Sequence, residues 1–521
     1  MTARPRPPSG RSRYSRRVPV RARVAVLAAA LTSLLVAAFA AVPGSPFQPV
    51  LPPGAAPAGP FRWLGETLGF AALRGDAAAF VGAALLAVAA AAYVALLVAV
   101  LRGEVPLRAV VAFAVLTQLA VVALPLLFSR DVYSYAAYGR IVAVHGANPY
   151  LLTPLDVAGD PVVAYVGPKW IDTPSVYGPA WSSIAAGVAA IAATPAAMVG
   201  WFRAIAIVAG LATTLLLVPV ARRVSPGREA LAVALFGCNP VVVFHTIASG
   251  HNDILVALGI VGALGLVAID RPTPAAVALA VAALVKAPAA VPLLLLLVWL
   301  AARAEPGARW RAVRAPLLAS VAVGLVVAGP YLQTEDPTLG MRELASHEGW
   351  LAPSRFVARL LELVAPGLPL AAIARATFAF ALVAGLVGVC VLVARRARDG
   401  VAALGAGWGW GLLLLMLLGP VLLPWYVAWA LPVAWLLPRR PAVAVVGTSV
   451  ALAVSLFATE PDRVAMAFRA NLFLGHWVIT PIVAALLVLA VRELRGGLRA
   501  AVPTPAGRVP AASGDPDRDR T

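Results

Sequence analysis

The chain has 521 residues, of which 61% are hydrophobic and 12% are charged, and its mean hydropathy is +0.88. Water-soluble domains contain about 45–50% apolar and about 25% charged residues, so this composition excludes a soluble globular protein. Apolar runs long enough to cross a membrane recur along almost the whole length. No polar block of domain size lies between them, which excludes a separate soluble catalytic or binding domain.

The formal net charge of +19 does not indicate nucleic-acid binding, because the basic residues concentrate in short loops between apolar runs. That distribution is typical of the cytoplasmic loops of a multi-span membrane protein. Only two of the 42 basic residues are lysines, Lys169 and Lys286. Both cysteines, Cys238 and Cys390, lie inside apolar runs, so we expect neither a disulfide nor a cysteine metal site.

The loop charges predict an all-α integral membrane protein of about 12–15 transmembrane helices with both termini inside the cell. One of the apolar runs read as a span is Trp425–Leu437. Residues 1–23 form a basic cytoplasmic segment, 24–492 a membrane body, and 493–521 a cytoplasmic, disordered tail. An arginine pair and the Ala38-Phe39-Ala40 sequence also resemble an export signal, but we favour an uncleaved anchor because further spans follow. The loops expected outside lie near 129–199, 249–253, 332–368 and 458–474. Residues 178–199 form either a span or an interfacial or re-entrant helix.

The apolar run Pro274–Arg303 is interrupted by Lys286-Ala287-Pro288. Basic loops on both sides of this run look cytoplasmic, so it must cross the membrane an even number of times. We therefore predict two short spans that meet at Lys286. Each is shorter than the hydrocarbon core of about 30 Å, which places Lys286 at the bottom of an outward-facing cavity.

In this topology the five histidines, both lysines and most acidic residues outside the tails lie near the outer face. A transporter is expected to place such groups near the middle of the membrane. Their one-sided distribution favours an enzyme that acts at the outer surface on a lipid-linked substrate. A lipid-linked sugar flippase or other transporter, and a structural membrane subunit, stay open as alternatives.

The first candidate site follows a predicted span, where Asp131, Tyr135 and Tyr138 recur at helical spacing on one face. A carboxylate at the membrane exit beside aromatic rings suits a general base toward a sugar hydroxyl. Alternatively, Asp131 caps the helix and the tyrosines belong to an interfacial aromatic belt.

The second candidate is the turn Gly250-His251-Asn252-Asp253 between two spans, which offers an imidazole, an amide and a carboxylate. A plain polar hairpin in which Asp253 caps the next helix is the alternative. A metal site is a further possibility, although no second cluster of matching spacing accompanies the turn.

Three further groups are candidates for binding a lipid-phosphate sugar. Lys286 suits a phosphate as a compact point charge, although a lysine at a helix end also reaches toward water for purely structural reasons. Trp425 and Tyr426, with Trp429 one turn further along, offer stacking surfaces or belong to an interfacial aromatic belt. Arg469, in the last outer loop, is one of several cations able to hold a phosphate leaving group.

Taken in order, several segments resemble the polytopic GT-C glycosyltransferases. They are most similar to actinobacterial polyprenol-phosphomannose-dependent α-(1→6)-mannosyltransferases of lipomannan synthesis. The matching stretches are Arg130-Asp131-Val132-Tyr133-Ser134-Tyr135 with Gly139-Arg140, Asn148-Pro149-Tyr150, Tyr177-Gly178-Pro179, Gly250-His251-Asn252-Asp253, Leu284-Val285-Lys286-Ala287-Pro288 and Pro424-Trp425-Tyr426.

The resemblance covers about residues 105–490. It implies an enzyme of the cell envelope that moves mannose from polyprenyl-phosphate mannose to a lipid-anchored mannan on the outer face of the plasma membrane. In this family an acid of the first large outer loop is the general base, and Asp131 holds the matching position. The implied mechanism is one inverting displacement with the phosphate stabilised by Lys286, aided by His251 or Arg469. No cofactor and no nucleotide are implied.

Overall fold

The computed structural model describes residues 19–52, 60–332, 339–340, 349 and 351–500. In these residues the regular structure is helical throughout, and no β-strand occurs. The apolar composition accounts for this, because a helix satisfies all its backbone hydrogen bonds within one segment, as hydrocarbon surroundings require.

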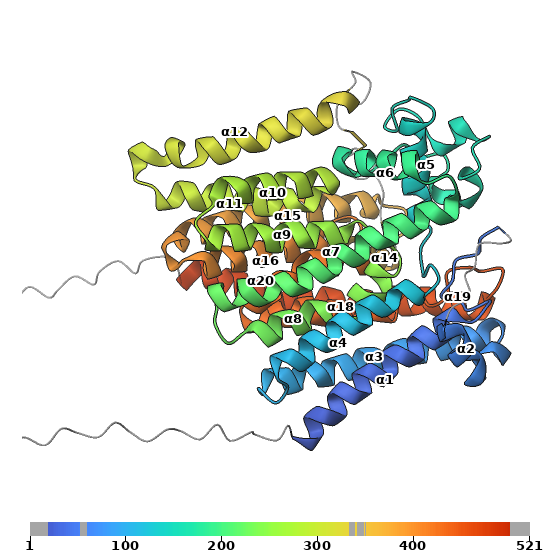
Figure 1. Ribbon diagram of the computed structural model, residues 1–521. Helices are drawn as coiled ribbons and strands as arrows, with labels where there is room; N and C mark the ends of the chain where they lie inside the picture. The colour runs from blue at the N-terminus through green and yellow to red at the C-terminus, as the bar shows by residue number, and fades with distance from the viewer. Residues whose placement is uncertain (1–18, 53–59, 333–338, 341–348, 350, 501–521) are drawn as a thin grey trace, which may run out of the picture.

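Residues 20–285 contain ten of the helices labelled in Figure 1. Their bounds are α1 Val20–Ala41, α2 Pro60–Thr67, α3 Gly75–Leu101, α4 Leu107–Ala120, α5 Asp131–Ala143, α6 Pro179–Ile191, α7 Pro195–Val224, α8 Glu229–Gly237, α9 Asp253–Ala268 and α10 Pro272–Val285. A π-helix, η6, covers Val241–Ile247 between α8 and α9.

The rest of the described chain is also helical. Its α-helices are α11 Ala290–Arg303, α12 Arg309–Ala328, α14 Pro353–Val364, α15 Leu370–Arg395, α16 Val401–Leu418, α17 Val427–Ala430, α18 Arg439–Ala453, α19 Ala465–Leu474 and α20 Thr480–Ala500. Short 3-10 segments connect some of them: η7 Ala287–Ala289, η11 Pro424–Tyr426 and η12 Leu431–Leu436.

The long helices run side by side in one bundle (Figure 1). α1 begins and α20 ends toward the left of this view, whereas α2, α5, α6 and α19 lie toward the right. The two short helices α5 and α6 pack closely on each other, and α6 also contacts α10. The helices that carry the Asp131 segment are therefore gathered at one end of the bundle.

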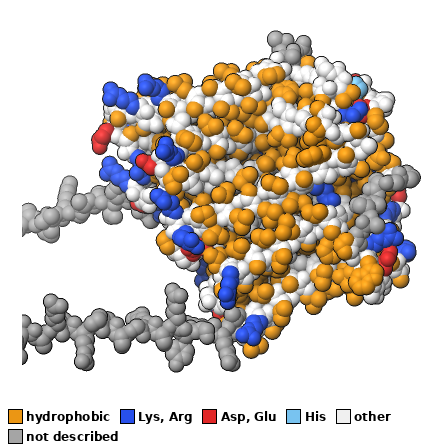
Figure 2. Space-filling model, in the orientation of Figure 1, with side chains coloured by type: hydrophobic (Ala, Val, Ile, Leu, Met, Phe, Trp, Pro, Cys, Tyr) orange, Lys and Arg blue, Asp and Glu red, His pale blue; other side chains and the backbone are white. Residues whose placement is uncertain are grey.

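A broad apolar surface covers the middle of the bundle, and most of the visible charged side chains lie toward its two ends (Figure 2). Among the described residues, seven helices are long and apolar enough to cross a membrane, or eight if the bent pair formed by α8 and η6 is one span. Five shorter apolar helices accompany them. The chain is thus an all-α, multi-span membrane protein, as predicted, while the expected number of 12–15 crossings stays a prediction.

The predicted interruption of the Pro274–Arg303 run is present. α10 ends at Val285, Lys286 has an extended backbone with φ −157° and ψ 129°, and α11 begins at Ala290. Pro288 explains the break, because proline has no N–H to donate and disfavours helical geometry in the residue before it.

One expectation differs from the structure. The predicted span Trp425–Leu437 is a succession of short turns, η11, α17 and η12, in which Pro432 prevents a continuous helix. α20 continues past residue 492 to Ala500, and the predicted boundary between membrane body and tail stays a prediction. Most of the basic segment 1–23 and the rest of the tail, 501–521, lie outside the described residues.

Candidate functional site

Asp131 is the first residue of α5, and Arg130 occupies the N-cap position before it. The carboxylate therefore lies at the positive end of the helix dipole instead of capping the helix. Two residues earlier, the Ser129 hydroxyl accepts a hydrogen bond from the Asp131 backbone N–H at 3.1 Å. Phe128 has a positive φ of 58° and stacks on His245, with ring centroids 4.1 Å apart. This contact helps to fix the turn that delivers Asp131 to the site.

The Gly250–Asp253 turn lies directly against the first turn of α5. Gly250 has a φ of +70°, and a Cβ added there would lie 2.7 Å from a methyl carbon of Val132. Only glycine therefore suits both the backbone conformation and the close approach. As a result, Nδ1 of His251 lies 3.6 Å from an Asp131 carboxylate oxygen and 3.5 Å from the Tyr135 hydroxyl. The His251 ring stacks on Trp425 at 3.7 Å.

Asp253 does not serve as a simple helix cap. Its carboxylate accepts hydrogen bonds from the Lys286 ammonium at 2.9 and 2.8 Å, and from the Trp429 indole N–H at 2.7 Å. The Lys286 ammonium also faces the Tyr426 ring, 4.8 Å from its centroid. Asp253 is completely buried and Lys286 is 8% exposed, so each charge depends on the other for compensation.

A cavity of about 470 Å³ begins at this ion pair. It runs between the start of α6, the α10–α11 break and α16, and its walls are mostly apolar. Lys286 is the one charged side chain among the described residues that line it. Tyr426 and Trp429 form the adjoining wall. The shape and chemistry suit a hydrocarbon chain that ends in an anionic group.

Burial shifts the pKa values of the acid and the imidazole of this cluster in opposite directions. Burial raises the pKa of the Asp131 carboxyl above its ordinary value, while the hydrogen bond with Ser129 and the positive charge of Lys286 oppose that rise. Burial also holds the pKa of His251 well below its ordinary value, and Lys286 lowers it further. His251 is therefore a neutral imidazole at physiological pH.

Three polar atoms of the turn are buried and have no hydrogen-bond partner among the described residues: Nε2 of His251 and both amide atoms of Asn252. Buried polar groups in native proteins are nearly always paired, with protein, water or a ligand. These atoms therefore mark a place where polar groups of a substrate or water are accommodated. In the described residues, no group of three or more His, Cys, Asp or Glu side chains is arranged to hold a metal ion.

The structure brings most of the predicted site residues together, with two qualifications. Tyr138 lies on the expected helix, but its hydroxyl donates to the Thr173 carbonyl at 2.8 Å and so holds the outer loop. Arg469 is exposed on α19 and lines a separate pocket with Phe457 and Phe473. The prediction that it holds a phosphate has no support from its position.

Two neighbours of the cluster were noted in the sequence but not chosen as site residues. Tyr177, from the segment before α6, is among the groups that lower the pKa of the Asp131 carboxyl. Trp429 is hydrogen-bonded to Asp253. Tyr177 belongs to a segment already noted for its family resemblance, so that motif was the available signal; spacing alone does not place it beside Asp131.

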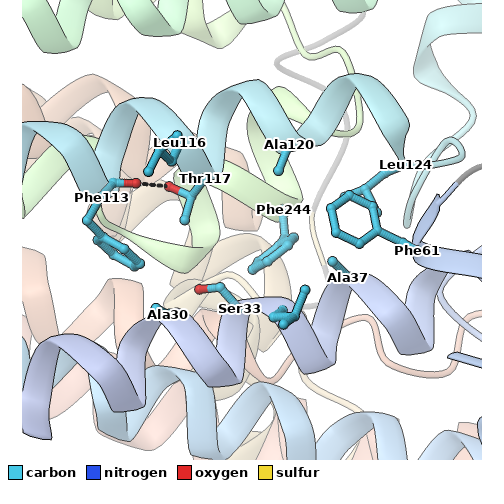
Figure 3. A pocket seen from close by; sticks show the side chains of 11 residues that line it. Ala30, Ser33, Ala37, Phe61, Phe113, Leu116, Thr117, Ala120, Leu124 and Phe244 are labelled. Atoms are coloured by element: carbon cyan, nitrogen blue, oxygen red, sulfur yellow. Dashed lines mark hydrogen bonds between the residues drawn. The ribbon is translucent and has the colours of Figure 1, made fainter. Parts of the chain in front are cut away.

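A second, smaller groove of about 200 Å³ lies between α1 and α4 (Figure 3). Its lining is almost entirely apolar, with Phe61, Phe113 and Phe244 contributing rings. The Thr117 hydroxyl on its wall donates to the Phe113 carbonyl at 2.9 Å. None of the predicted site residues lines this groove.

Comparison of the sequence with known proteins identifies a family whose matching region contains the candidate site. Residues 26–303 match the family model described as alpha-(1->6)-mannopyranosyltransferase, N-terminal domain. This region contains Asp131, the Gly250–Asp253 turn and Lys286. No solved structure matches the chain.

Two relatives illustrate the similarity. Alpha-(1->6)-mannopyranosyltransferase A of Mycobacterium tuberculosis is 29% identical over 396 residues, which cover 72% of this chain and 74% of that protein. Alpha-(1->6)-mannopyranosyltransferase B of Corynebacterium glutamicum is 38% identical over 156 residues, covering 28% of this chain and 25% of the relative.

Proposed function

Because the chain belongs to the alpha-(1->6)-mannopyranosyltransferase family, and is thus a membrane mannosyltransferase, we propose that it moves mannose from polyprenyl-phosphate mannose to a lipid-anchored mannan, forming an α-(1→6) linkage. The reaction takes place at the outer face of the plasma membrane. The single observation that carries this proposal is the apolar cavity that ends at Lys286, close to Asp131.

The donor fits this cavity by its chemistry. A polyprenyl chain is branched hydrocarbon, which matches the apolar walls contributed by Leu284, Val291 and Leu415. The phosphate lies at the Lys286 end. An ammonium carries three N–H groups, and the bonds to Asp253 use two of them. Lys286 is thereby held in place by Asp253 while it presents positive charge to the phosphate.

The chemical step is one inverting displacement. The acceptor hydroxyl oxygen forms a bond to the anomeric carbon, and the bond from that carbon to the phosphate oxygen breaks. The electron pair leaves with the phosphate, whose negative charge Lys286 stabilises. The hydroxyl proton passes to Asp131, the general base. His251 and Asn252 accommodate sugar hydroxyls through their unpaired buried polar atoms.

The test of this proposal is a transfer assay in membranes that contain the full-length protein. Labelled mannose is supplied either on polyprenyl phosphate or on a nucleoside diphosphate, together with a lipid-anchored mannoside acceptor. We expect transfer from the polyprenyl-phosphate donor alone. Transfer from the nucleotide donor in membranes free of polyprenyl phosphate would contradict the proposal. Movement of the lipid-linked sugar across the membrane without transfer would indicate a flippase instead.

A further inference from the structure

Tyr177 and Gly178 connect the two halves of the proposed active site through the backbone. The Gly178 N–H donates to the Val285 carbonyl at 3.1 Å. A Cβ added at Gly178 would lie 2.1 Å from the Leu284 carbonyl oxygen, so the two backbones are in direct contact. On the other side, the Tyr150 hydroxyl donates to the Tyr177 carbonyl at 2.7 Å. Residues 177–178 are therefore fixed against the segment that leads into Lys286.

The Tyr177 side chain extends from this anchored segment to the base. It is 7% exposed, and its ring meets the Tyr135 ring edge-on, with centroids 4.8 Å apart and an interplanar angle of 87°. Tyr135 lies one helical turn from Asp131, on the same face of α5, and Tyr177 is among the groups that lower the pKa of the Asp131 carboxyl. One residue thus lies beside the proposed base, and the next contacts the backbone that precedes the proposed phosphate-binding lysine.

We propose that Tyr177 and Gly178 form a positioning element that sets the location of Asp131 relative to Lys286. This inference rests on the proposed function. In-line displacement requires the base and the leaving-group site to be held at a fixed separation, and a misplacement of about 1 Å costs roughly 10²-fold in rate. Asp131 and Lys286 lie on different helical segments, so a connection between them maintains that separation.

The phenol also influences the protonation of Asp131. Several other titratable or charged groups face this carboxyl: Lys286, Asp253, His251, Tyr135, Tyr138 and Tyr426. Burial raises the pKa of Asp131, whereas donation from Tyr177 stabilises the carboxylate and opposes the rise. Removing the phenol hydroxyl therefore raises the pKa further, and the base becomes protonated at a higher pH.

The first arm of the test is Tyr177→Phe, assayed as transfer over a range of pH in membranes. We expect kcat to fall several-fold, the donor KM to stay unchanged, and the acid limb of the kcat/KM profile to move to higher pH. Tyr165→Phe is the matched control, because Tyr165 stacks on Tyr133 with centroids 5.0 Å apart and is not among the groups that act on Asp131. An acid limb that stays in place in Tyr177→Phe overturns the inference.

The second arm is Gly178→Ala, which forces the Leu284 carbonyl away and shifts Lys286. We expect the donor KM to rise at least several-fold. Gly187→Ala on α6 is the control, because a Cβ there meets no atom within 4 Å. An unchanged donor KM in a folded Gly178→Ala protein contradicts the inference.

Failure of the inference and failure of the proposed function give different results. If wild type transfers no mannose, the function is wrong. If wild type is active and Asp131→Asn is inactive, but Tyr177→Phe matches wild type at every pH, the positioning role alone is wrong. A Gly178→Ala protein that does not fold leaves the Tyr177→Phe profile to decide.

Discussion

Lys286 and Asp253 form a buried pair whose two members have different proposed roles. Asp253 neutralises the lysine within the protein, while Lys286 faces the cavity and the phosphate. Breaking a buried ion pair by removing one partner typically costs about 3–5 kcal/mol, but replacing both partners by neutral groups is often nearly neutral for stability. This difference allows the structural and functional contributions of Lys286 to be separated.

We predict that Lys286→Met lowers thermal stability and raises the donor KM by at least tenfold. In the double variant Lys286→Met with Asp253→Asn, we expect stability to recover because no buried charge is left uncompensated, while the donor KM stays high. Thermal unfolding in detergent and transfer kinetics measure the two effects. If the double variant recovers the wild-type donor KM, Lys286 is only a structural partner of Asp253.

The sequence identified the segments that carry this site, but it did not predict the contacts between them. Asp131, His251 and Lys286 stand out from the sequence because ionisable groups are rare in apolar surroundings and costly there. The pairing of Asp253 with Lys286 is a contact across 33 residues, and helical spacing does not reveal such contacts. Arg469 was selected for its charge alone, and charge does not show that its helix faces a different pocket.

At the scale of elements, the sequence predicted where helices break better than it predicted which helices pack against each other. The basic loops on both sides of Pro274–Arg303 correctly predicted the interruption at Lys286. Pro432 argues in turn against the continuous span that hydropathy suggested for Trp425–Leu437. The π-helix η6 has no comparable signal in its sequence, and such segments are rare.

The outer loop after α5 is held by one buried carboxylate. Asp160 accepts hydrogen bonds from Nε of Arg140 at 2.7 and 2.8 Å, lies 3.0 Å from Nε2 of His145, and accepts from the Val162 N–H at 3.0 Å. Burial on its own would raise the pKa of Asp160, but these bonds outweigh it and lower the pKa below its ordinary value.

Because the folded-state pKa of Asp160 lies below its unfolded value, its stabilisation is fully present above the unfolded pKa and is lost as the pH falls through the folded pKa. We predict that Asp160→Asn speeds hydrogen exchange in residues 145–166 at neutral pH, with a loss of about 1–3 kcal/mol in local opening free energy. Wild type should show similar exchange only in acid. Asp172→Asn, an exposed acid of the same loop, is the control, and equal exchange in both variants would contradict the assignment.

At the scale of the whole molecule, the face seen in Figure 2 is apolar across its middle, and most of its charged side chains lie toward the two ends. Composition and loop charges were sufficient to predict the all-α membrane class, because hydrocarbon surroundings leave few structural alternatives. The number of crossings is harder to predict, since five apolar helices have only 10–17 residues. Short helices of this kind either cross a thinned membrane or end within it.

The predicted orientation is tested by cysteine accessibility in a Cys390→Ala background, where the remaining Cys238 is buried. We expect Asp172→Cys, in the outer loop, to react with a membrane-impermeant maleimide in intact cells. Arg102→Cys, in the loop between α3 and α4, should react only after lysis. Both positions are exposed in the structure. The reverse labelling pattern would place the Asp131 cluster on the cytoplasmic side.

The central claim is that the Asp131 carboxylate removes the acceptor proton. Its most direct test is the rate of mannose transfer from polyprenyl-phosphate mannose by Asp131→Asn, which keeps the shape of the side chain and removes its basicity. Asp172→Asn serves as the control for loss of an acid near the site. The account predicts a fall of about 10²–10⁴-fold in kcat for Asp131→Asn, with normal folding and donor KM, and near-wild-type transfer by Asp172→Asn. Transfer by Asp131→Asn at the wild-type rate would contradict it.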